Sequence, residues 1–171
     1  MTETPALRPR GDASGPQPSA GIGAPLGWES LLNPEGRDRL TSIDAAVDGG
    51  ELLDRVGKTL RARGVPPEEV AAALTQHELR AKARAKFGEA ARRMLFTPAG
   101  LEQATRAPVA ALHARRFAEA DCRVVADLGC GIGAESLALQ GARLAPRAVE
   151  IDPFTAAVAE PGNPLPIEPT V

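Results

Sequence analysis

The feature that most constrains the fold is the run Arg123-Val-Val-Ala-Asp-Leu-Gly-Cys-Gly-Ile-Gly133. Its first part, Val124 to Leu128, is almost continuously apolar, which predicts a short parallel strand covered on both faces. Glycines then alternate at positions 129, 131 and 133, where they permit positive φ and let a ligand approach backbone N–H groups closely. A helix is expected from about Ala134, with the positive end of its dipole at the loop. This order predicts a turn that binds a nucleoside-type ligand.

The glycines alone leave the ligand open, because they also satisfy the G-x-G-x-x-[GA] fingerprint of dinucleotide-binding proteins. A nicotinamide or flavin site, and a strand–helix turn with no ligand, are therefore alternatives. Asp127 favours another ligand, since a carboxylate two residues before the first glycine suits an ammonium group better than a pyrophosphate. Glu150 lies near the end of a second apolar run, where an acid in a doubly wound sheet reaches ribose hydroxyls.

These two segments together resemble the class I S-adenosylmethionine-dependent methyltransferases: Asp127-Leu-Gly-Cys-Gly-Ile-Gly133 and Ala148-Val-Glu-Ile-Asp-Pro153. Upstream, Arg93-Met-Leu-Phe-Thr-Pro-Ala-Gly-Leu-Glu-Gln-Ala-Thr105 is similar to the bacterial methyltransferases with a THUMP-like domain. Phe96-Thr-Pro98 is more distantly similar to the cap guanine-N2 RNA methyltransferases. Together the resemblances cover roughly residues 28 to 160.

The resemblance implies S-adenosyl-L-methionine as the cofactor. In that family's pattern, the carboxylate of Asp127 lies near the methionine ammonium, the glycines form the cradle, and Glu150 binds the ribose. The implied cofactor-binding residues are Asp127, Gly129, Cys130, Gly131, Gly133, Glu150 and Ile151, together with Phe96 and Thr97. Thr97 has a second interpretation, as an N-cap followed by proline, with Phe96 and Leu101 forming a hydrophobic staple.

The predicted fold class is α/β, with a helical domain followed by the first β-α-β unit of a Rossmann-like methyltransferase sheet. Residues 1–26 are rich in Pro, Gly, Ser, Ala and Thr and are expected to form a disordered leader. Residues 27–120 are expected to form four to six short helices, and residues 121–160 a partial cofactor-binding domain. Residues 161–171 contain repeated prolines and are expected to be an unstructured tail.

Local signals place several element boundaries. Helices are expected to begin at Asn33-Pro34, at Pro66-Pro67, at Thr97-Pro98 and at Pro108. Apolar residues at 52, 53, 56 and 60 predict one face of a helix that ends near Gly64. The second strand is expected to span about 147–151, because Pro146 limits where it can begin.

Six basic residues follow one another in the helical region: Arg80, Lys82, Arg84, Lys86, Arg92 and Arg93. They are either a solvated helix face or a surface that contacts the phosphates of an RNA substrate. His77 and His113 lack Asp, Ser or Cys partners at a sequence spacing typical of a catalytic or metal site, so they are interpreted as helix-surface residues. We therefore predict neither a metal site nor a nucleophilic triad.

Composition limits the remaining function classes. The 171-residue chain has a net charge of −2 and a pI near 5.8, so no global basic field indicates nucleic acid. Its two cysteines, Cys122 and Cys130, are too few for a disulfide framework and are expected to be reduced thiols. The sequence shows no apolar signal segment and no run of about eighteen apolar residues. A cytoplasmic protein that does not contact a membrane is expected.

The family uses a seven-stranded sheet, whereas this sequence predicts two strands and lacks the family's acceptor-binding motif. We therefore expect a truncated methyltransferase whose family acts on RNA and which is inactive alone. The sheet residues Val124, Val125 and Val149 are expected to lack a covering layer of helices. The alternative is a noncatalytic helical interaction module with a vestigial cofactor half-site. The catalytic residues, the methylated atom and the oligomeric state are not predicted.

Overall fold

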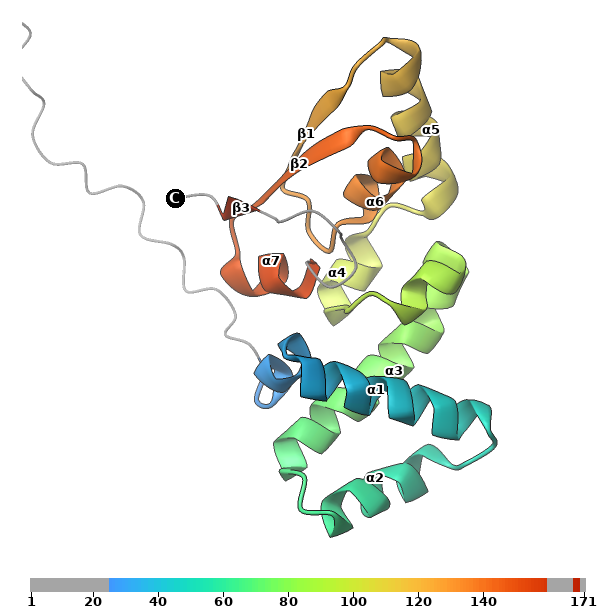
Figure 1. Cartoon of the computed structure of the whole chain (residues 1–171), viewed down its shortest axis with the longest axis vertical. Coiled ribbons are helices and arrows are strands. Elements are labelled where there is room, and N and C mark those ends of the chain that lie inside the picture. The colour runs from blue at the N-terminus through green and yellow to red at the C-terminus, as the bar shows by residue number, and fades with distance from the viewer. Residues whose placement is uncertain (1–24, 160–167, 170–171) are drawn as a thin grey trace, which may run out of the picture.

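The computed structural model describes residues 25–159 and 168–169. The predicted leader lies almost wholly outside the described residues, and so does most of the predicted tail. Figure 1 shows two regions, with the first helices at one end of the molecule and the strands at the other. The described part is mostly helical with a small parallel sheet, so the fold is α/β.

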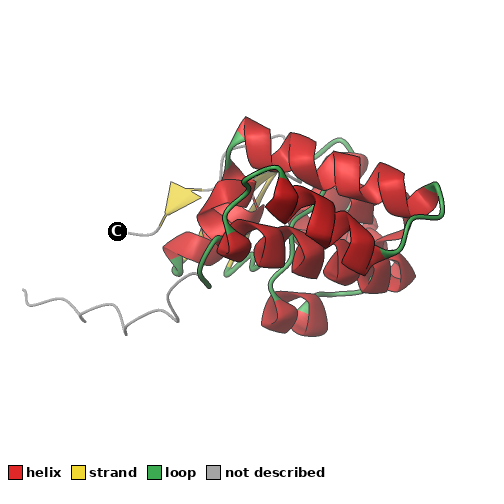
Figure 2. Ribbon diagram, turned by 90° about the horizontal axis from the view of Figure 1, so that it is seen from below, coloured by secondary structure: helices red, strands yellow, loops and turns green. Residues whose placement is uncertain are grey.

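The first region is helical, as the sequence predicts. Its elements are η1 (Trp28–Leu32), α1 (Pro34–Asp48), α2 (Leu53–Ala62), α3 (Pro67–Phe87), η2 (Gly88–Arg92), α4 (Pro98–Gln103) and α5 (Ala107–Glu119). Two predicted N-caps are confirmed, because Asn33 Oδ1 accepts from Gly36 N at 2.9 Å and Thr97 Oγ1 accepts from Gly100 N at 2.9 Å. Viewed from below, helices cover the near side of the molecule (Figure 2).

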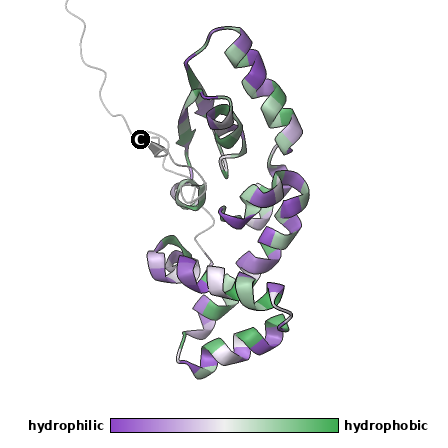
Figure 3. Ribbon diagram, turned by 45° about the vertical axis from the view of Figure 1, so that its right-hand side comes forward, coloured by the Kyte–Doolittle hydropathy of each residue, from purple (hydrophilic) through white to green (hydrophobic). Residues whose placement is uncertain are grey.

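One large apolar cluster holds this region together. It is built mainly from α1, α3 and the segment Met94–Phe96, whose three side chains are at most 2% exposed. Hydrophilic and hydrophobic residues alternate along the helices in Figure 3, as expected for helices that each bury one face. The prediction that Leu52 lies on the apolar face of this helix is wrong. Helix α2 begins at Leu53, and Leu52 precedes it as the N-cap with 76% exposure.

The second region contains β1 (Val124–Leu128), α6 (Ala134–Gly141), β2 (Ala145–Glu150), α7 (Pro153–Ala159) and β3 (Glu168–Pro169). The strands are parallel in the order β1-β2-β3, and Val125 pairs with Pro146. The predicted bounds of β1 are confirmed. The two-residue strand β3 was not expected, since the sequence there predicts an unstructured tail.

Strand β2 begins at Ala145, two residues before the predicted start, and includes Pro146. The backbone N–H of Ala145 donates to Arg123 O at 2.9 Å, so it points towards β1. The backbone N–H groups of successive residues in a strand point towards opposite neighbouring strands. The nitrogen of Pro146 therefore faces away from β1. Strand β3 pairs only with Val149 and Glu150, so no ladder hydrogen bond is lost at the proline.

The sheet is covered on one face, whereas the sequence predicts a strand covered on both. Val125 is 8% exposed and packs with Ala114, Leu139 and Leu144 from α5 and α6 or its following turn. The small residues of α7 pack with Ala148 on the same face. The opposite face carries Val124 and Leu128, which are 59% and 76% exposed. The expectation that Val124, Val125 and Val149 lack cover is thus confirmed for Val124 and wrong for Val125, whereas Val149 is half-buried.

Among the described residues, no helix combines the length and the apolar character needed to cross a membrane.

Candidate functional site

The glycine loop adopts the backbone conformation that the sequence predicts. Gly129, Gly131 and Gly133 have φ angles of 76°, 55° and 81°. A Cβ at Gly129 or Gly131 would meet no atom within 4 Å, so the backbone there borders open space. Gly133 is the N-cap of α6. The loop therefore presents backbone to a ligand at the two positions where side chains would otherwise cover it.

The end of β2 fixes the other side of the loop. Val149 O accepts from Gly129 N at 2.8 Å and from Cys130 N at 3.0 Å. Gly133 N donates to Cys130 O at 2.9 Å, which closes the turn into α6. The loop is therefore held at the carboxyl end of the sheet, where ligands of open α/β sheets bind.

Glu150 joins the two predicted motifs directly. Its side chain is buried, with 8% exposure, and Oε2 accepts from Gly131 N at 2.9 Å. Oε1 accepts from Asp152 N at 3.0 Å. Each carboxylate oxygen retains capacity for a further donor, because an ionised carboxylate has about four acceptor positions. Glu150 therefore both shapes the loop and keeps the ability to accept from a ligand hydroxyl.

Asp127 lies at the end of β1 against the first turn of α6. Ser136 Oγ donates to Asp127 Oδ2 at 2.6 Å, and Ser136 is fully buried. Burial raises the pKa of Asp127 above its ordinary value, and the hydrogen bond from Ser136 opposes that rise. Sequence reasoning missed Ser136. Its place in the first turn of the helix that follows the glycine loop is the signal that could have indicated a partner for Asp127.

Cys130 forms a wall of the loop and carries no charge. The residue is 9% exposed and packs with Ala148 and with Ala156 and Ala159 of α7. Burial first, then the nearby carboxylates of Asp127 and Glu150, raise the pKa of its thiol to about 12. Its chemistry is that of a small apolar side chain rather than a nucleophile. Ile151, by contrast, is 76% exposed.

Phe96 and Thr97 take the structural roles that the sequence left as an alternative. Phe96 is fully buried, and its ring centroid lies 5.6 Å from that of Phe87. Thr97 caps α4, and Leu101, at the position expected for a hydrophobic staple, is 8% exposed in the same cluster as Phe96. The ring of Phe96 therefore offers no exposed surface to a ligand in this structure.

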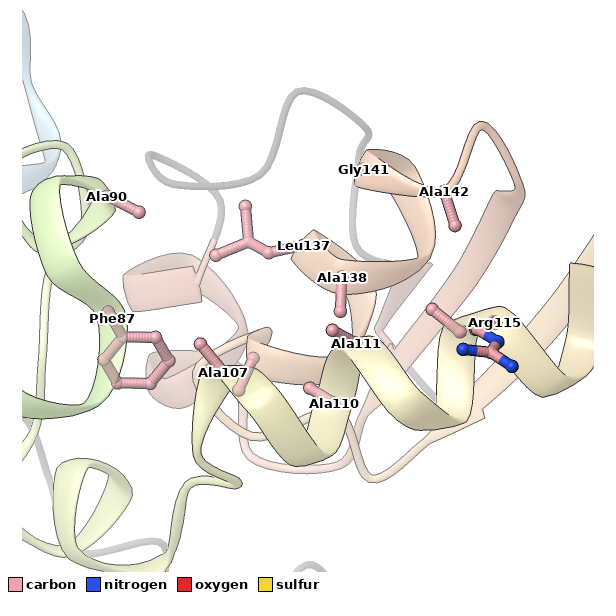
Figure 4. A pocket seen from close by; sticks show the side chains of 12 residues that line it. Phe87, Ala90, Ala107, Ala110, Ala111, Arg115, Leu137, Ala138, Gly141 and Ala142 are labelled. Carbon is pink, nitrogen blue, oxygen red and sulfur yellow. The ribbon is translucent and has the colours of Figure 1, made fainter.

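A cavity of about 420 Å³ lies between α5 and α6 (Figure 4). It is lined mostly by small residues of α5 and α6, together with Phe87 and Ala90. Gly129, Gly131 and Glu150 do not line it. The cavity therefore lies between α5 and α6 and does not include the open backbone of the loop at Gly129 and Gly131.

The six basic residues divide into internal and surface groups. The inclusion of Arg80 in this surface is corrected by the structure. Arg80 is buried and its Nη1 lies 2.8 Å from Asp44 Oδ2, so it does not belong to an RNA-contacting surface. Lys86 Nζ donates to three carbonyls at the end of α4, Leu101 O, Glu102 O and Ala104 O. Arg84 and Arg92 are exposed and both pair with Asp48. Lys82 and Arg93 are exposed.

The two histidines have acidic partners that are distant in sequence. The prediction that His77 is a helix-surface residue is wrong. Its Nδ1 lies 2.7 Å from Asp44 Oδ1, and both side chains are only 14% exposed. His113 is exposed, as predicted, and Nδ1 lies 3.0 Å from Glu135 Oε1. Within the part of the chain that the structure describes, no group of three or more His, Cys, Asp or Glu residues could hold a metal ion.

Comparison with known proteins adds to this geometry. The profile of a family described as a domain of unknown function (DUF8688) matches residues 27–83. An uncharacterized S-adenosylmethionine-dependent methyltransferase of Mycobacterium tuberculosis, found in strains CDC 1551 / Oshkosh and H37Rv, is 47% identical over 88 residues. The match covers 47% of this chain and 23% of the relative, so the chain spans about a quarter of the relatives' length. No solved structure matches. The partial similarity supports an S-adenosylmethionine-dependent methyltransferase.

Proposed function

We propose that this chain provides the S-adenosylmethionine-binding part of a methyltransferase. The observation that carries the proposal is the glycine loop, whose open backbone at Gly129 and Gly131 lies beside the acid at the end of β2. The similarity to proteins named as methyltransferases supports it independently, although that match covers only part of either chain.

The residues present fit the cofactor. The cradle at Gly129 and Gly131 would be filled by any side chain, and Glu150 has acceptor capacity for ribose hydroxyls. Asp127 is a carboxylate whose ionised form is disfavoured by burial, so a cationic ligand group beside it would offset that cost. When bound, the cofactor supplies an activated methyl group. The chain's own contribution is to bind and orient this methyl donor and to exclude water from it.

RNA is the acceptor that we propose for this enzyme. After the buried and internally bonded Arg80 and Lys86 are set aside, four of the basic residues remain on the surface of α3, η2 and the residue that follows η2: Lys82, Arg84, Arg92 and Arg93. Asp48 partly neutralises two of them. If these residues contact phosphates, Lys82→Ala with Arg93→Ala should weaken RNA binding uniformly across sequences and reduce its salt dependence.

We also propose that these 171 residues bind the cofactor without transferring methyl groups alone. The described sheet is open on the face that carries Val124 and Leu128 and along the edge of β1. Incorporation of labelled methyl groups into bulk RNA, above the level of a Gly131→Val control, would contradict this. If the chain binds no cofactor at all, the noncatalytic interaction module is the better description.

Titration calorimetry with S-adenosylmethionine tests the proposal. Gly131→Val should abolish binding, because the side chain would occupy the cradle and strain a φ of 55°. Gly64→Val is the matched control: its φ is 84°, its Cβ would also meet open space, and it lies between α2 and α3, so binding should persist. Equal loss in both variants would mean that backbone strain, rather than blocked access, is responsible.

Glu150→Ala should weaken binding by about 1.5–3 kcal/mol, the scale of hydrogen bonds to a charged group. Unchanged affinity would remove Glu150 from the site. Tighter binding of NADH than of S-adenosylmethionine would overturn the proposed function.

A further inference from the structure

The glycine loop is anchored in the helical region as well as in the sheet. Ile132, between the last two glycines, is 3% exposed and belongs to the large helical cluster rather than to the clusters under the sheet. A Cβ placed on Gly100 of α4 would lie 2.5 Å from Ile132 Cγ2. Glycine at position 100 therefore allows α4 to contact the loop directly.

The position of α4 depends in turn on the segment that precedes it. Met94–Phe96 has no helical structure and is almost fully buried, so its backbone polar groups need partners within the protein. Thr97 then caps α4 through Gly100 N, which places the contacting residue in the first turn of that helix. Any displacement of this segment is transmitted over a few residues to the Gly100–Ile132 contact.

Two side chains of α3, one turn apart, supply those partners. Gln76 Nε2 donates to Phe96 O at 2.6 Å, and Gln76 Oε1 accepts from Phe96 N at 3.1 Å. Arg80 Nε donates to Met94 O at 3.0 Å, while its Nη1 pairs with Asp44 of α1. Gln76 is fully buried, so its amide has no alternative partner in solvent.

From these contacts we propose that Gln76 and Arg80 are positioning residues for the cofactor loop. They fix Met94–Phe96 against α3, and that segment holds Gly100 against Ile132. The helical region is then part of the binding machinery, although it supplies no atom to the cradle. The importance of this arrangement for cofactor affinity rests on the proposed function, whereas the effect on the loop's conformation does not.

The first experiment compares two core variants of α3 by amide hydrogen exchange. Gln76→Leu removes both bonds to Phe96, and Val70→Ala removes volume from a fully buried position that faces Gly57. Both should lower the melting temperature. Only Gln76→Leu should accelerate exchange at the bonded amides of Gly129, Gly131 and Gly133, by at least about tenfold relative to the Val125 amide of β1. Equal acceleration in both variants would overturn the proposal.

The second experiment tests the contact itself, and it applies even if Gln76→Leu does not fold. Gly100→Ala would place its methyl group 2.5 Å from Ile132 Cγ2 and 2.7 Å from the capping oxygen Thr97 Oγ1, and it should change the exchange and chemical shifts of the loop amides. Ile132→Ala removes the contact on the loop side and leaves the one with Thr97, so the double variant should restore the loop amides, but not the amides of α4, towards the spectrum of Ile132→Ala alone. Loop amides that ignore Gly100→Ala would overturn the proposal.

Affinity for S-adenosylhomocysteine separates the two proposals. If the wild-type chain binds it, Gln76→Leu should weaken binding at least about tenfold, while Val70→Ala should leave it within about twofold under conditions where both are folded. If the wild-type chain does not bind it, the proposed function fails, and the exchange measurements still decide whether α3 positions the loop.

Discussion

The helical region and the sheet region differ in how completely each buries its apolar side chains. The helical region has one continuous cluster that extends from Trp28 through α3 to Phe96 and reaches into the loop at Ile132. Each of the two clusters under the sheet contains four buried residues, largely alanine, valine, leucine and cysteine. The opposite face of the sheet is exposed at Val124 and Leu128.

This difference shows where stability and function lie in the molecule. A parallel sheet normally has both faces covered, and here only one face is. The cofactor loop is attached to this weaker region, yet Ile132 and the Gly100 contact bind it to the stronger one. The geometry of the loop therefore depends on a core that contains none of the predicted ligand contacts except Phe96.

The largest effect is expected from Phe96→Ala. Removal of a fully buried aromatic side chain from the helical cluster should lower the free energy of unfolding by about 3–5 kcal/mol. Urea unfolding followed by circular dichroism measures this. The exposed Phe117 on α5 provides the control, because Phe117→Ala should cost far less. A small effect of Phe96→Ala, combined with a large loss of cofactor affinity, would return Phe96 to the binding site.

A smaller effect should separate the two faces of the sheet. Val125→Ala removes buried methyl groups and should cost about 1.5–2 kcal/mol, at about 0.8 kcal/mol for each buried carbon. Val124→Ala, on the adjacent residue and the opposite face, should stay within about 0.5 kcal/mol. Similar losses at the two valines would show that the second face is covered in solution, by another copy of the chain or by a segment outside the described residues.

The smallest effect concerns the pH dependence conferred by Asp127. Because its pKa is raised in the folded protein, the folded state holds this proton more tightly than the unfolded state does. The resulting stability is fully present below the unfolded pKa and is lost as the pH rises through the folded pKa. Asp127→Asn removes that loss, so the variant should gain stability relative to wild type as the pH rises above about 4, the ordinary pKa of an aspartate.

Urea titrations across that range measure the difference, with the exposed Asp38→Asn of α1 as a control that should show no such gain. The gain should be below about 1 kcal/mol, within the range of ordinary substitutions. The same variant should bind S-adenosylmethionine more weakly, because it lacks the negative charge proposed for the ammonium group. A loss of stability at neutral pH would show that the hydrogen bond from Ser136 outweighs the cost of burying Asp127.

Local chemistry in the sequence determined much of the backbone. Asn33 and Thr97 each cap the helix that begins at the next residue. The alternating glycines adopt positive φ because no Cβ opposes it. The near-continuous apolar run before the glycines predicted the bounds of β1. The sequence also predicted that the loop and Glu150 lie at the carboxyl ends of neighbouring parallel strands, whereas the hydrogen bond from Gly131 N to Glu150 Oε2 was not predicted.

Only the tertiary structure decided the burial and pairing of residues that are far apart in sequence. Arg80 belongs to a basic run on α3, but Asp44 of α1 and the carbonyl of Met94 draw it into the interior. The sequence likewise could not show that α5, α6 and α7 cover the same face of the sheet, or that Pro146 faces away from β1. Propensities and caps act within one turn or strand, whereas these outcomes depend on which elements meet.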